Sequence, residues 1–174
     1  MSKKPEKVIT IIHTGTGNFG HCRINGHLRS KASTIISYLG KLDTCQSYTY
    51  CLSGYRKPIQ DYFFILGSLV NNPDSEKYLV EIENLYNQFK EHTEELIKDL
   101  DALTGFIRTN RCNGELMFLR SLIREAELVA TKAVQEGELD RNHIKYLNFL
   151  SDYVFAMIWY MTAENSELEL WCGL

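Results

Sequence analysis

The stretch HIKYLNFLSDYVFAMIWYM, residues 143–161, is the strongest structural signal in the chain. Three polar residues interrupt its apolar pattern: Ser151 falls within the apolar face, and Asn148 and Asp152 lie along its edge. An unpaired buried polar group costs about 1–3 kcal/mol, so these side chains either lie at a solvated edge or are met by another helix, a ligand or water. The large apolar side chains recur at steps of three and four residues, which predicts one face of a buried helix: Ile144, Leu147, Leu150, Val154, Ile158 and Met161.

Length and composition favour one compact globular domain over residues 1–174, because the chain is 44% hydrophobic and 24% charged. A net charge of −3 gives no basis for broad nucleic-acid binding. No apolar run approaches the roughly 20 residues that a membrane span needs. Five scattered cysteines without a CxxC pair indicate reduced thiols, and so a cytoplasmic protein.

Helical periodicity dominates the chain after residue 29. We expect an extended run at Val8–Ile12, an irregular segment at Arg23–Arg29 and a loop at Thr104–Asn113. The predicted fold class is all-α: a five-helix bundle of the ferritin-like, four-helix-bundle type, with residues 1–29 as an extended glycine-rich N-terminal segment and the helices within residues 30–163. The predicted helices run from a Ser30 cap to Cys51, from Ile59 to Val70, from Asp74 or Ser75 to Leu100, from Gly114 to Gln135, and from Asp140 or Asn142 to Thr162.

The N-terminal segment contains a glycine-rich loop, TGTGNFG, at residues 14–20. Its G-x-G-x-x-G spacing matches the dinucleotide fingerprint, but that fingerprint needs an immediate helix and a second parallel strand, which are not apparent here. A run of small residues can instead expose backbone N–H groups that surround an anion, with Thr14 and Thr16 adding hydroxyl donors. The alternative is a simple N-terminal turn.

The predicted helix at 114–135 carries a polar ribbon beside its apolar side, formed by Arg120, Arg124 and Glu127. Two arginines one turn apart can hold a polyanion, or one of them can pair with a carboxylate across the bundle, for which Asp43 is the natural partner. The alternative is a solvated face with an internal Arg124–Glu127 pair, which would contribute little to stability.

Four patches, in order, resemble one family, the PduO-type ATP:cob(I)alamin adenosyltransferases, which are trimers of five-helix bundles. The loop at 14–20 resembles T-K-T-G-D-x-G, and LGKLDTCQS at 39–47 resembles L-G-T-V-D-E-L-N-S. LRSLIREAEL at 119–128 resembles A-R-T-V-C-R-R-A-E-R, and LNFLSD at 147–152 resembles L-N-R-L-S-D.

This resemblance implies transfer of the 5′-deoxyadenosyl group of ATP to cob(I)alamin, which gives adenosylcobalamin and triphosphate. It implies ATP, Mg²⁺ and a cobalamin substrate as ligands, a homotrimer, and a reductase or an adenosylcobalamin-dependent enzyme as a possible partner. In the family, a phenylalanine displaces the lower ligand of cobalt. Carried over by position, the corrinoid side would comprise Asp43, Phe106 and Arg120, and the ATP side would comprise Thr14, Thr16, Gly17, Gly20, Lys31, Arg124 and Asn148.

Several positions depart from the family pattern on the ATP side. Each lost charge-assisted contact with phosphate would cost about 1.5–3 kcal/mol. An alternative function is therefore a catalytically impaired corrinoid-binding or delivery protein on the same scaffold, and a third is a helical interaction module whose resemblance is only ancestral. The departures are Gly15 for Lys, Asn18 for Asp, His27 and Leu28 in the G-E-R motif, Arg108, Thr109 and Asn110 in F-I-L-P-G-G-S, and Glu125, Leu128 and Phe149 for three arginines.

Overall fold

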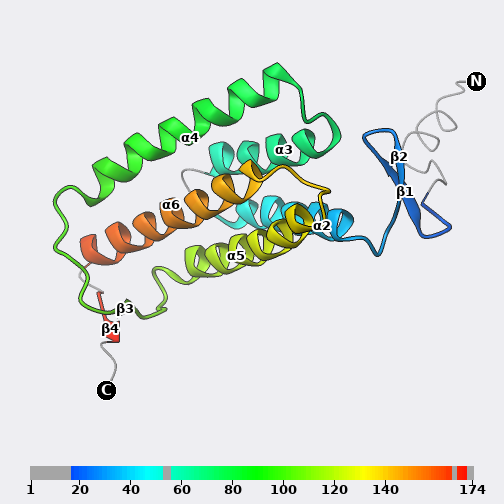
Figure 1. The fold of residues 1–174 in the computed structure, drawn as a ribbon. Coiled ribbons are helices and arrows are strands. Elements are labelled where there is room, and N and C mark those ends of the chain that lie inside the picture. Colours follow the sequence, from blue (N-terminus) through cyan, green and yellow to red (C-terminus); the bar gives the residue numbers. More distant parts are fainter. Residues whose placement is uncertain (1–16, 53–55, 166–167, 172–174) are drawn as a thin grey trace, which may run out of the picture.

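The computed structural model describes residues 17–52, 56–165 and 168–171, and over these ranges the chain is a helix bundle (Figure 1). This confirms the all-α prediction. No helix in the described ranges is long and apolar enough to cross a lipid bilayer. The helices of this part are α2 (Thr34–Tyr48), the short 3₁₀ helix η1 (Thr49–Cys51), α3 (Arg56–Asn71), α4 (Glu76–Ile97), α5 (Gly114–Gln135) and α6 (Asn142–Glu164).

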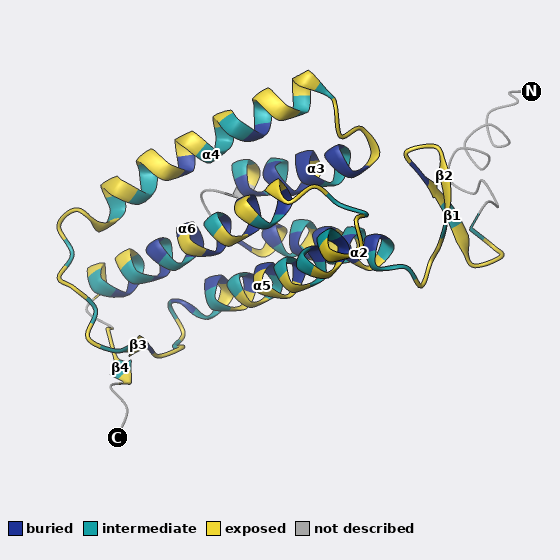
Figure 2. Cartoon of the chain, in the orientation of Figure 1, coloured by how far each residue is buried: buried dark blue, intermediate teal, exposed yellow. Residues whose placement is uncertain are grey.

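Helix α6 lies at the centre of the packing, against α5 and α4, as its apolar sequence predicts. Leu147, Leu150, Val154 and Ile158 are fully buried. Helix α5 also packs against α2, and it turns small residues toward its neighbours: Ala126, Ala130 and Ala133 are each 0% exposed. Helix α4, whose outer side is exposed, covers the bundle from one side (Figure 2).

The segment predicted to be irregular, Arg23–Arg29, forms a hairpin instead, so that prediction was wrong. Strand β1 (His21–Ile24) pairs antiparallel with β2 (His27–Ser30). The turn is made by Asn25 and Gly26, whose φ angles of 46° and 75° are the left-handed values that a two-residue hairpin turn requires. Asn-Gly between short strands is a strong hairpin signal, and it was available in the sequence.

The predicted cap at Ser30 was also wrong, because Ser30 ends β2 and Ser33 takes the N-cap position of α2. The hairpin is tied to the bundle by an ion pair in which Arg29 Nη1 lies 2.8 Å from Glu138 Oε1, just after α5. A second strand pair joins β3 (Phe106–Ile107) to β4 (Leu170–Trp171). The two strand pairs lie at opposite ends of the bundle (Figure 1).

A buried polar contact joins the first and last helices of the described bundle. Tyr38 Oη and His143 Nδ1 are 3.0 Å apart, and the two rings meet edge to face. Burial lowers the pKa of His143 to about 4, although the nearby Asp140 opposes the shift. His143 is therefore neutral in the folded protein at neutral pH.

We expect the free energy of unfolding to fall as the pH is lowered from 7 to 4. The pKa of His143 is about 4 when folded and near the ordinary 6.5 when unfolded, so the unfolded chain binds the proton more tightly. This contribution is complete above pH 6.5 and is lost toward pH 4. H143Q should reduce the loss by about 3 kcal/mol in urea titrations followed by tryptophan fluorescence. Equal pH slopes for both proteins would contradict the assignment.

Candidate functional site

The described candidate residues lie in four places: by the first hairpin, in the second strand pair, on α5 and α6, and on α2. Gly17, Gly20 and Lys31 lie by the β1–β2 hairpin, and Phe106 lies in the β3–β4 pair at the opposite end. Arg120, Arg124 and Asn148 lie along α5 and α6, and Asp43 lies on α2. Thr14 and Thr16 fall outside the described residues.

The hairpin region brings Lys31 onto the glycine turn. Gly20 N–H donates to the Gly17 carbonyl at 3.3 Å, and Lys31 N–H donates to the Gly20 carbonyl at 2.8 Å. The ammonium Nζ of Lys31 lies only 2.8 Å from the point where a Cβ on Gly17 would stand. The Lys31 ammonium thus lies close to the main chain of a residue without a side chain. A positive charge beside accessible main chain suits a phosphate group.

Arg120 lies between α5 and α6 with part of its guanidinium out of water. Its Cζ lies 5.0 Å from the centre of the Phe155 ring, and its Nε is buried without a hydrogen-bond partner in the described part of the chain. Burial, followed by the charge of Arg124, lowers the pKa of Arg120, whereas Asp152 opposes that shift. The two arginines thus form one local concentration of positive charge.

The polar residues that interrupt the 143–161 stretch take two different positions. Asn148 and Asp152 are exposed, one helical turn apart, as expected for a solvated edge beside the arginines. Ser151 is 0% exposed, and its Oγ has no hydrogen-bond partner among the described residues. The exposed side chains of Asn148 and Asp152 are therefore accessible to a polar ligand.

Asp43 does not meet the arginines within one chain. Over the described ranges it forms no ion pair with Arg120 or Arg124, and Arg124 forms none with Glu127. Asp43 instead lines a groove of about 260 Å³ between α2 and α3, on a side of α2 that α5 does not cover. The predicted Asp43–arginine contact across the bundle is thus not formed within this chain.

Two departures from the family pattern prove to be paired in space. Lys41 Nζ on α2 lies 2.6 Å from Glu125 Oε2 on α5, and both side chains are partly exposed. Where the family has an uncharged Thr and an Arg, this chain has Lys41 and Glu125, so the positive charge lies on α2 and a negative charge takes its place on α5. The sequence alone did not indicate this pairing, since residues 84 positions apart meet only through the helix packing.

Phe106 lies in strand β3 and is 72% exposed, and the loop that follows it is fixed by side-chain hydrogen bonds. After it, Asn113 is fully buried: its Nδ2 donates to the Arg108 carbonyl at 3.0 Å, and its Oδ1 accepts from Asn110 N–H at 2.9 Å. Asn110 Oδ1 in turn accepts from the N–H groups of Cys112 and Asn113. This network replaces the proline and glycines of the family loop, and its Asn-x-x-Asn spacing before a helix was its only sequence signal.

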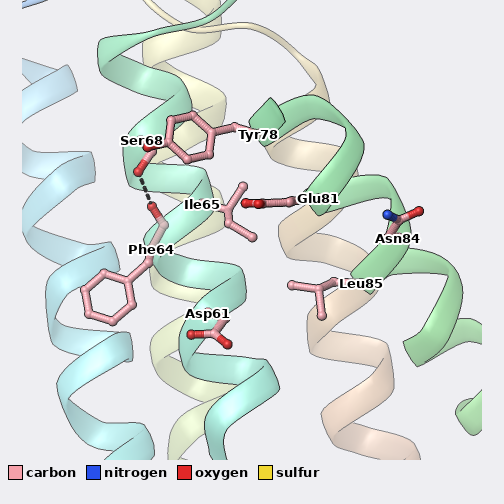
Figure 3. A pocket seen from close by; sticks show the side chains of 8 residues that line it. All are labelled: Asp61, Phe64, Ile65, Ser68, Tyr78, Glu81, Asn84 and Leu85. Atoms are coloured by element: carbon pink, nitrogen blue, oxygen red, sulfur yellow. Dashed lines mark hydrogen bonds between the residues drawn. The ribbon is translucent and has the colours of Figure 1, made fainter. Parts of the chain in front are cut away.

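A groove of about 540 Å³ lies elsewhere, between α3 and α4 (Figure 3). Asp61 and Glu81 place carboxylates in it, which disfavours a polyphosphate, and none of the candidate residues lines it. In the described ranges, no three His, Cys, Asp or Glu side chains gather as a metal site would require. The sequence-predicted residues therefore remain the candidates.

The fold and these residues define a helix-bundle protein with a basic cradle on a glycine turn and an arginine-bearing helix face. The model of the cobalamin adenosyltransferase family matches residues 12–161, so the chain belongs to this family.

Curated relatives include the corrinoid adenosyltransferase MMAB of Bos taurus, 36% identical over 74 residues, and that of Homo sapiens, 38% identical over 72 residues. The matched region covers 41% and 40% of this chain, and only 31% and 29% of those relatives. Among solved structures, a variant PduO-type ATP:corrinoid adenosyltransferase from Lactobacillus reuteri, complexed with cobalamin and ATP, has a TM-score of 0.80. It is 20% identical, with 93% of this chain and 99% of that chain covered, which establishes a shared fold.

We expect N113A to lower the free energy of unfolding by about 1–3 kcal/mol or more, because it leaves buried backbone groups without partners. Urea denaturation measures the change. S121A, which removes an exposed hydroxyl bonded only within its own helix, is the control and should change stability little. Equal stability of N113A and wild type would mean that the loop does not depend on this side chain.

Proposed function

We propose that this protein transfers the 5′-deoxyadenosyl group of ATP to cob(I)alamin as a single cytoplasmic domain over residues 1–174. The observation that carries the proposal is the Lys31 ammonium lying over the Gly17 backbone, at the position where the family wraps triphosphate. A second cationic element is available on α5, where Arg120 lacks a partner for Nε. Backbone donors and cations together are what a polyphosphate needs.

The proposed site is formed between copies of the chain, in a homotrimer. The hairpin lies beyond the end of its own bundle, at the opposite end from the strand β3 (Figure 1), which contains Phe106. Asp43 and Arg120 lack an ion-pair partner within the described protomer, although both carry charge. A neighbouring copy that places its Asp43 against Arg120, and its hairpin over the arginine face, would satisfy both residues at once.

Each side chain then has a role in positioning or electrostatics. Lys31, Gly17, Gly20 and Arg124 would hold the phosphates, and the exposed Asn148 amide would orient the nucleotide. Mg²⁺ would enter with the phosphate oxygens, because it usually keeps few protein ligands. The exposed Phe106 ring would supply an apolar wall that excludes a lower ligand from cobalt.

The chemistry itself belongs to the two substrates. The cobalt–C5′ bond forms with the electron pair of cob(I)alamin as the C5′–O bond breaks, and triphosphate leaves with the pair from that bond. No side chain acts as nucleophile, so the protein contributes orientation and stabilisation of the charge on the leaving group.

One observation favours the alternative of a corrinoid-binding protein without catalysis. Glu125 is an anionic residue at a position where the family has an arginine. Its ion pair with Lys41 holds this negative charge beside the arginine face. Such a protein would alter the cob(II)alamin spectrum without ATP, but would give no heat with millimolar Mg-ATP in isothermal titration. Absence of nucleotide binding would therefore overturn adenosyl transfer, and the cob(II)alamin spectrum would then decide between the corrinoid role and a helical interaction module.

R124A is expected to lower kcat/KM for adenosylcobalamin formation by about 10- to 150-fold, the loss of one charge-assisted phosphate contact. The reaction is followed by absorbance under anaerobic, reducing conditions. R141A removes another exposed arginine, outside the proposed site, and should keep wild-type kinetics. If both variants behave alike, Arg124 does not contact the nucleotide.

Restoring the family residues with K41T/E125R should tighten Mg-ATP binding by about 10- to 150-fold, because an arginine replaces the repelling carboxylate. Isothermal titration gives the affinity. K41T alone breaks the Lys41–Glu125 pair without adding a cation, so it should not improve binding. An unchanged affinity in the double variant would place position 125 outside the phosphate site.

A further inference from the structure

The end of the described chain returns to the loop that carries Phe106. Strand β4 pairs antiparallel with β3, with Phe106 opposite Trp171 and Ile107 opposite Leu170. Arg108 N–H extends the ladder by donating to the Glu169 carbonyl at 2.9 Å. Two segments more than 60 positions apart in the sequence are thus held in a fixed register at Phe106.

Alternate side chains of this strand pair face in different directions. Ile107 is 7% exposed and Leu170 packs against the core, so these two anchor the pair to the bundle. Phe106 and Trp171 are 72% and 51% exposed, and their ring centres lie 6.1 Å apart at an interplanar angle of 33°. The strand pair therefore presents the rings of Phe106 and Trp171 on its exposed side, while Ile107 and Leu170 anchor its backbone to the core.

This arrangement restricts Phe106 from both sides. The Asn110–Asn113 network fixes the loop after Phe106, while β4 fixes the strand that contains it. An exposed phenylalanine without a neighbour would sample several rotamers, whereas an adjacent indole limits that freedom and stabilises one arrangement by aromatic contact.

We propose that Trp171 is a positioning residue that holds the Phe106 ring in place and extends it into a two-ring apolar wall for the flat corrin macrocycle. The proposal rests on the proposed function, since it assumes that Phe106 faces the corrinoid. It assigns a role in the corrinoid site to the C-terminal strand, which comes from outside the four sequence patches that resemble the family.

The test measures the fraction of four-coordinate cob(II)alamin formed with Mg-ATP, by electron paramagnetic resonance. W171A should lower this fraction by about 2- to 10-fold, the population shift that one aromatic contact supports, while leaving the affinity for Mg-ATP unchanged. W171F keeps a ring beside Phe106 and should restore most of the signal. F106A sets the full loss, and L168A, an exposed residue of the same segment, should match wild type.

The outcomes separate this inference from the proposed function. A wild-type protein that forms no four-coordinate species overturns both. A wild-type signal that W171A leaves unchanged overturns the role of Trp171 alone. A loss in W171A that W171F also shows, with equal melting temperatures, would contradict an aromatic role. A fluorescence shift of Trp171 upon F106A, in a W159F background that removes the other tryptophan, is expected if the rings are in contact.

Discussion

The close approach of α5 to its neighbours is the constraint on which the rest of the structure depends. Three fully buried alanines on α5 let its neighbours pack tightly against it, because a methyl group is the smallest side chain that can separate two helix backbones. The two arginines and Glu125 lie on α5, and Lys41 reaches Glu125 from α2, so their positions follow from this packing. A bulkier residue at any of the three positions would move the whole charged face.

The sequence predicted the helices well, because periodic apolar residues such as Leu147, Leu150 and Val154 encode burial directly. The β1–β2 hairpin lacks a periodic signal, because Ile24 is its only buried residue and no apolar alternation marks its strands; the Asn25-Gly26 turn is its one local indication. Strand β4 has two residues, too few for any periodic signal.

The candidate site was predictable only in part, for a similar reason. The proximity of Lys31 to the glycine turn agrees with the resemblance to the family. The separation of Asp43 from Arg120 depends on which side of α2 the other helices cover, and a helical wheel does not determine this. Membership of the cobalamin adenosyltransferase family is established by the match over residues 12–161. The trimeric site and its ligands are a proposal, which would pair Asp43 of one copy with Arg120 of another.

The buried contact between Tyr38 and His143 also bears on how the chain is made. Its two partners are 105 residues apart, and those of the Arg29–Glu138 pair are 109 apart. At about 5–20 residues per second on a ribosome, α2 would wait roughly 5–20 seconds for its partners to be synthesised. Of the main helices that pack on α2, only α3 follows it closely in the chain, so until α5 and His143 are made the side of α2 that they cover would stay exposed.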